Sequence, residues 1–129
     1  MTAFKWLTRQ AIETIHEEQI EEHGGLPGLK DANALEASLA RPLHKNAYGE
    51  DDLFPLAAAY LHGFARNHPF HDGNKRTAYL AAFTFLFING YIIEATQAQI
   101  IEFVLAVSAG EIDEDGATRF LRDHTVPLN

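Results

Sequence analysis

Apolar side chains recur at helical spacing along most of this chain, and turn-forming residues separate the repeats. The first repeat follows Thr8, a residue type that caps helices, and ends near residue 23 before a glycine pair. Its isoleucines share one side and its glutamates the other. A shorter helix is predicted to begin at Asp31 or Asn33 and to reach about Ala40, because Pro42 disrupts a helix interior.

The next stretch, residues 44–52, is polar and follows no helical pattern, so we expect a mobile flap there. A long helix is then predicted to begin near Asp51 or Asp52, with a proline tolerated in its first turn. It should stop near Asn67, because His68 precedes a second proline and is biased away from the right-handed helical region.

A second strongly apolar helix is predicted over residues 75–88, with Asn74 as its cap. Its apolar side chains point nearly all round, which places it at the centre of the fold. Beyond it, residues 91–93 predict a short extended piece, and residues 96–108 and 113–123 predict two more helices. The fold class is therefore all-α, a compact bundle of about six helices around a central apolar helix.

Composition narrows the class of protein. The chain has 129 residues, 47% of them hydrophobic, which suits one domain over residues 1–129 with one core. It has no cysteine, which excludes disulfides, thiolate metal sites and a cysteine nucleophile. The formal net charge of −8 argues against direct nucleic-acid binding. The start does not resemble a secretory signal, and the longest apolar run, residues 78–88, is too short to span a membrane. We expect a cytoplasmic protein.

The turn between the two apolar helices, residues 68–76, concentrates the reactive side chains of the chain. Amides after Gly73 lie at a helix N-terminus, which favours an anion such as phosphate. Lys75 and Arg76 stand in the first helical turn, where cations are unfavourable unless an anion binds there. Asp72 can hold a divalent cation against phosphate oxygens, and His68 is placed to accept a proton from an attacking hydroxyl, a role for which imidazole is well suited.

Simpler interpretations exist for the same residues taken singly. Asp72 or Asn74 alone would serve as a helix cap, and Arg76 alone as a surface cation. His62 and His71 are interpreted as structural histidines. The combination of His68 with the turn that follows favours a phosphate-handling site.

The segment His68-Pro69-Phe70-His71-Asp72-Gly73-Asn74-Lys75-Arg76 resembles the signature of the Fic/Doc superfamily. In that signature, His-Pro-Phe, two further residues and Gly-Asn-Gly/Lys-Arg follow one another. Residues 24–28, the short helix after Asp31, the apolar helix and the turn at Gly110-Glu111 also resemble the death-on-curing (Doc) toxins.

The resemblance implies a helical Fic fold and a transferase that uses ATP and Mg²⁺ to modify a protein hydroxyl. It implies that His68 is the catalytic base, that Asp72 is the metal ligand and that Phe70 is the core anchor. It also implies a set of ATP or phosphate contacts, namely Gly73, Asn74, Lys75, Arg76 and Arg66.

Two departures from the Fic pattern bear on the reaction. AMP-transferring Fic enzymes have glycine where Lys75 stands and a second arginine where Tyr79 stands, and both differences are those of Doc toxins. In Doc toxins they accompany transfer of the terminal phosphate of ATP to elongation factor Tu, which blocks protein synthesis. Pro69 and Gly73, in contrast, match the Fic enzymes, so AMP transfer to a protein hydroxyl remains the alternative.

We expect another protein chain to inhibit such an enzyme. Self-restraining Fic proteins carry a Ser/Thr-x-x-x-Glu-Gly/Asn helix, and the nearest match here, Thr14 to Gln19, ends in the wrong residue. The resemblance to Doc toxins implies an antitoxin protein whose disordered segment folds into a groove of the toxin.

Two other classes of protein remain open. His62, His68 and His71-Asp72 are residue types found in HD-type metal phosphohydrolases, which need several such ligands converging on one metal. A non-catalytic interaction module with an inactive pocket is the other alternative, although His68, Asp72, Asn74 and Arg76 are all present.

Overall fold

The computed structural model describes residues 3–129 and contains six helices and one pair of short strands. The predicted all-α class and helix number are confirmed. In chain order the elements are α1 (Arg9–His23), α2 (Ala32–Ala47), α3 (Leu53–Asn67), α4 (Asn74–Ile88), β1 (Tyr91–Ile93), α5 (Gln97–Ser108), α6 (Glu114–Asp123) and β2 (Thr125–Pro127).

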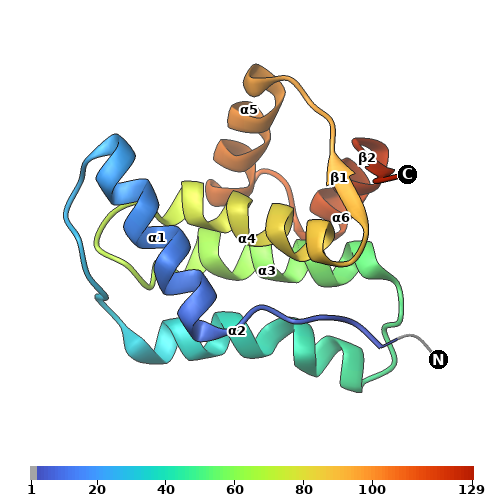
Figure 1. Cartoon of the computed structure of the whole chain (residues 1–129), viewed down its shortest axis with the longest axis horizontal. Helices are drawn as coiled ribbons and strands as arrows, with labels where there is room; N and C mark the ends of the chain where they lie inside the picture. Colours follow the sequence, from blue (N-terminus) through green and yellow to red (C-terminus); the bar gives the residue numbers. More distant parts are fainter. Residues whose placement is uncertain (1–2) are drawn as a thin grey trace.

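Helices α3 and α4 lie side by side in the middle of the molecule (Figure 1). Helix α2 packs along α3 on the side away from α4, α1 crosses α4, and α5 and α6 complete the bundle (Figure 1). No helix within residues 3–129 combines the length and apolar character needed to cross a bilayer.

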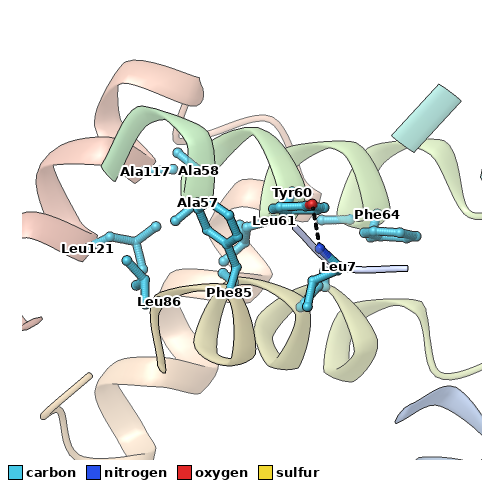
Figure 2. Close-up of a cluster of buried hydrophobic side chains, with 14 of the residues drawn as sticks. Leu7, Ala57, Ala58, Tyr60, Leu61, Phe64, Phe85, Leu86, Ala117 and Leu121 are labelled. Atoms are coloured by element: carbon cyan, nitrogen blue, oxygen red, sulfur yellow. Dashed lines mark hydrogen bonds between the residues drawn. The ribbon is translucent and has the colours of Figure 1, made fainter. Parts of the chain in front are cut away.

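One cluster of buried side chains draws members from all six helices. Helix α3 is the most enclosed element, because ten of its 15 residues are buried. Figure 2 shows how its inner face meets Phe85 and Leu86 of α4 and Leu121 of α6. The N-terminal segment joins this core where the Leu7 amide donates to the Tyr60 hydroxyl at 3.1 Å (Figure 2). Burial raises the pKa of that hydroxyl to about 12, so it stays protonated.

Side-chain caps explain where most helices begin. Thr8 accepts from the Ala11 amide, Asp31 from the Ala34 amide and Asp52 from the Phe54 amide. Each bond satisfies an amide that has no partner within its helix. Thr96 and Asp113 cap α5 and α6 in the same way. The predicted starts of these five helices are therefore confirmed.

The predicted end of α2 near Ala40 is wrong, because the helix continues to Ala47 with Pro42 inside it. Proline costs a helix interior about 3 kcal/mol, since it removes one hydrogen bond and crowds the preceding turn. Pro42 is itself buried, as are Leu35 and Leu39 on the same helix, which packs along α3. Burial of this face of α2 offsets the cost of Pro42 in the helix. The flap expected over residues 44–52 is therefore half helix, and only residues 48–52 form the connection.

The extended piece at residues 91–93 is confirmed as β1, but its partner was not predicted. β2 pairs with it antiparallel, with Ile92 opposite Val126. A strand of three residues carries too short a pattern to be recognised from sequence.

Glu114, in the first turn of α6, ties three helices together. Its carboxylate accepts a hydrogen bond from Lys45 of α2 at 2.6 Å and two from Arg41 of the same helix. His62 of α3 lies 3.7 Å away. Burial alone would raise the pKa of Glu114, but the bonds from Lys45 and Arg41 outweigh burial and lower it.

Replacing Glu114 with glutamine is expected to lower the free energy of unfolding at pH 7 by about 1–2 kcal/mol, since charge-assisted bonds are lost and solvent screens part of them. A carboxylate whose pKa is lowered in the folded state stabilises above its unfolded pKa, near 4.5, and loses that contribution as pH falls further. Urea denaturation from pH 7 to pH 3 should show the two proteins converging below pH 4.5. Glu36→Gln, at an exposed ion pair with Arg9, is the matched control and should cost less. A constant gap at all pH values would contradict the assignment.

Candidate active site

The candidate site is the loop of residues 68–73, which joins α3 to α4 beside α1 (Figure 1). Helix α3 ends at Asn67, as predicted, and His68 follows with φ 48° and ψ 59°. His68 is the only non-glycine residue within residues 3–129 with positive φ. Its side chain is exposed. Left-handed backbone at a residue with a side chain costs about 1–2 kcal/mol, and such strain is concentrated at functional sites.

Phe70 anchors the loop, in the role that the resemblance implied. Its side chain is 2% exposed and stacks on the His16 ring, with 3.7 Å between ring centroids. Asn74 closes the turn around it, because its side-chain oxygen accepts from the Phe70 amide and its side-chain nitrogen donates to the Phe70 carbonyl. The prediction that Asn74 caps α4 is wrong. Gly73 occupies the cap position, and the side-chain amide of Asn74 is hydrogen-bonded to the Phe70 backbone instead.

Asp72 is held through both its side chain and its backbone. Oδ2 of its carboxylate accepts from the Leu26 amide at 2.7 Å, and its carbonyl oxygen accepts from His16 Nε2 at 2.7 Å. The approach is close, because a Cβ at Gly25 would lie 3.1 Å from the Asp72 Cβ. The carboxylate therefore has a defined orientation, with Oδ1 accepting no bond from residues 3–129.

The connection between α1 and α2 runs alongside the loop and braces it. The Pro69 carbonyl accepts from the Lys30 and Asp31 amides at 2.8 and 3.0 Å, and the His71 amide donates to the Gly28 carbonyl at 3.3 Å. These bonds form an isolated antiparallel bridge between Leu29 and Phe70. The segment that resembles Doc toxins at residues 24–28 thus lies against the loop that carries the signature.

The start of α4 is open to an anion. Gly73, at φ 79°, begins the helix without a side-chain cap, so the first-turn amides have no side-chain acceptor within residues 3–129. A side chain at Gly73 would be strained by this φ and would contact Ile20 and His16 at 3.4 and 3.5 Å. Lys75 and Arg76 are exposed and form no ion pair with a described residue. Three positive features therefore share the first turn of α4: its open amides and the side chains of Lys75 and Arg76.

These residues fit ATP phosphates and Mg²⁺. Unpaired amides, a helix N-terminus and two cations are the donors that phosphate oxygens require. Asp72 offers a carboxylate oxygen beside them, and Mg²⁺ is commonly bound by one or two carboxylates together with substrate phosphates. Within residues 3–129, no three histidine, aspartate or glutamate side chains group closely enough to hold a metal without such help.

Two further residues named from the resemblance contact other parts of the fold. Arg66, in the last turn of α3, donates to the Ser108 carbonyl at 3.0 Å, which ties α3 to the end of α5. Tyr79, one turn beyond Lys75, is half-buried against Phe83, and burial raises the pKa of its hydroxyl. No cation therefore stands where AMP-transferring relatives have their second arginine.

Of the histidines interpreted as structural, His62 packs beside Glu114, and burial lowers its pKa. The residue that was missed is His16, which lies in α1 and touches both Phe70 and Asp72. A signal was present in the sequence, because His16 stands midway between Ile12 and Ile20 on the apolar side of the helix.

Comparison with known proteins agrees with this geometry. Residues 6–86 match the Fic/DOC family. The chain is 34% identical over 117 residues to "Protein kinase doc" of Escherichia phage P1, covering 90% of this chain and 92% of that protein. It is 48% identical over 75 residues to "Toxin Doc" of Mycolicibacterium smegmatis, covering 56% of this chain and 57% of that protein. The signature loop, the six helices and these matches together show that the chain belongs to the Fic/DOC family.

Proposed function

We propose that this protein is the toxin of a toxin–antitoxin pair and transfers the terminal phosphate of ATP to a hydroxyl of a translation factor, elongation factor Tu. The observation that carries the proposal is the uncapped start of α4, where Lys75 and Arg76 are exposed and have no ionic partner among residues 3–129. Two cations at the positive end of a helix dipole are unfavourable unless an anion joins them. The names of two relatives, "Protein kinase doc" and "Toxin Doc", support kinase activity and action as a toxin.

In the proposed reaction, the acceptor hydroxyl oxygen forms a bond to the terminal phosphorus while the bond between that phosphorus and the ADP oxygen breaks. The imidazole of His68 takes the hydroxyl proton, and ADP leaves with the electron pair of the broken bond. The amides of Asn74, Lys75 and Arg76, with the two cationic side chains, orient the phosphates and balance their charge. Phe70 and Asn74 keep the loop in the shape that this arrangement requires.

Asp72 would hold Mg²⁺ through its carboxylate, and the cation supplies charge neutralisation at the phosphate oxygens. The Leu26 amide donates to Oδ2 of Asp72, so Oδ1 is available to bind Mg²⁺.

Lys75 and Tyr79 support phosphate transfer over AMP transfer. Lys75 projects from the first turn of α4, where a glycine would leave space for a phosphate. The half-buried Tyr79 hydroxyl cannot replace an arginine that would hold the terminal phosphate away from the reacting centre.

The position of the label on ATP tests the reaction. Incubation with elongation factor Tu and Mg²⁺ should label the factor from ATP labelled on the terminal phosphate, and leave it unlabelled from ATP labelled on the innermost phosphate. The reverse pattern would establish AMP transfer, with His68 still the base. A cell lysate in place of the purified factor tests the choice of target. Absence of label there, with ATP binding intact, would favour a non-catalytic interaction module.

An antitoxin partner completes the proposal. A disordered segment that folds on this chain would restrain it, as implied by the resemblance to Doc toxins. We expect the antitoxin to be encoded by a small neighbouring reading frame for a DNA-binding protein. Co-expression of that frame should relieve the growth arrest expected when this chain is produced alone.

Asp72→Asn and Arg76→Ala are expected to weaken ATP binding in different ways. The asparagine can still accept from the Leu26 amide but loses the charge that holds Mg²⁺, so only magnesium-dependent binding should fall. The alanine removes a charge-assisted bond to phosphate of about 1.5–3 kcal/mol, with or without the metal. Calorimetric titration with ATP in Mg²⁺ and in a chelator measures both effects. Equal metal dependence in the two variants would contradict this division of roles.

A further inference from the structure

His16 is a buried polar residue on α1, a helix that lies outside the signature segment. It is 3% exposed and stands on α1 with Ile12 one turn before it and Ile20 one turn after. An apolar residue would fill such a position without the cost of desolvating an imidazole. Its presence calls for a polar partner, and that partner lies in the loop.

The contact partner defines which ring nitrogen of His16 carries a hydrogen. A carbonyl oxygen can only accept, so the 2.7 Å contact between His16 Nε2 and the Asp72 carbonyl requires a hydrogen on Nε2. The ring also lies flat on Phe70, with 8° between the planes. One side chain thus holds the backbone of Asp72 by a hydrogen bond and the side chain of Phe70 by stacking.

The effect on the site follows from peptide geometry. The structure has no cis peptide in residues 3–129, so the Asp72 carbonyl and the Gly73 amide point in opposite directions across one planar unit. Because the carbonyl points at α1, the Gly73 amide points away from α1. The same bond fixes the Cα from which the Asp72 carboxylate projects, and the Leu26 amide then fixes the carboxylate itself.

We propose that His16 is a positioning residue that holds the Asp72–Gly73 peptide in the orientation from which the Asp72 carboxylate binds Mg²⁺. The inference rests on the proposed function for its consequence in binding, but the brace itself is a property of the free protein. His16 acts through Asp72 and Phe70 and does not touch the reacting groups.

Three variants separate this role from simple packing. His16→Phe keeps a flat ring against Phe70 and loses the donor. His16→Gln keeps a donor near the position of Nε2 and loses the ring. Ile12→Val is the matched control, because it removes a buried methylene from the same helix one turn away from the loop contacts.

Hydrogen exchange of the ligand-free proteins tests the brace. His16→Phe should speed exchange of the Leu26, Phe70 and His71 amides, which donate to Asp72, Asn74 and Gly28, by roughly threefold to tenfold, the loss expected for one hydrogen bond. His16→Gln should stay nearer to the wild type, and Ile12→Val should leave these three amides unchanged. Equal exchange of the three amides in wild type and His16→Phe would overturn the inference, whether or not the protein binds ATP.

Titration with Mg²⁺ at fixed ATP tests the consequence. His16→Phe should raise the Mg²⁺ concentration for half-maximal ATP binding about tenfold, as loss of a supporting partner does at other metal sites, while binding in a chelator stays nearly unchanged. A loss of ATP binding that is equal with and without Mg²⁺ would overturn the positioning role. If the wild type fails to bind ATP, the proposed function fails, and the exchange result still decides the brace.

Discussion

Replacing His68 with alanine is expected to lower phosphoryl transfer by about 10²- to 10⁴-fold, the usual contribution of a positioned general base. The side chain is exposed and closes no cavity, so removing it should change the free energy of unfolding by about 1 kcal/mol or less. Transfer of the terminal-phosphate label measures the first quantity, and urea denaturation the second. ATP binding should persist, because the proposed phosphate contacts are residues of α4 and do not include His68.

His71→Ala is the matched control for that experiment. His71 is also an exposed histidine of the loop, three positions further on, and its backbone bond to Gly28 survives the substitution. It should retain most of the activity. Near-normal transfer by His68→Ala, or an equal loss in both variants, would remove His68 from the role of base.

Phe70→Ala should have the largest effect on stability within the site, lowering the free energy of unfolding by about 3–5 kcal/mol, as expected for a buried aromatic side chain. Phe70 is 2% exposed, so its removal leaves a cavity against His16. The loop also loses its anchor, and ATP binding should fall together with stability. Denaturation in urea with and without ATP measures both losses.

Phe87→Ala provides the comparison, because the same side chain type on α4 is 46% exposed at that position. Its cost should be well below that of Phe70→Ala, and ATP binding should not change. A Phe70→Ala protein with wild-type stability would show that the loop does not depend on this anchor.

The sequence predicts those parts of the structure that depend on near neighbours. Caps such as Thr8 and Asp52 act within three residues, so the helix starts could be recognised. The signature loop could be recognised for the same reason, because its reactive residues are contiguous in the chain.

Contacts between distant segments were not predictable in this way. The bond from His16 to Asp72 spans 56 positions and that from Leu26 to Asp72 spans 46, and no local pattern identifies Asp72 as the partner of either residue. The continuation of α2 through Pro42 depends equally on packing against α3, which outweighs the local preference of proline. The sequence predicted helix N-terminal amides after Gly73 but placed Asn74 as the cap, and it did not predict that the Asn74 side chain closes the turn around Phe70 and leaves the start of α4 open.

The brace on the loop also bears on the order in which the protein is made. Within residues 3–129, the hydrogen bonds that reach the loop from outside α3 and α4 come from His16, Leu26, Gly28, Lys30 and Asp31, all of which precede His68 in the chain. On the ribosome these partners are synthesised before the loop itself, and the remaining partners, Asn74 and Thr77, follow it directly in α4. The nascent chain therefore holds every hydrogen-bond partner of its signature loop before α5 and α6 exist, and those two helices act on the loop through the core they share with α3 and α4.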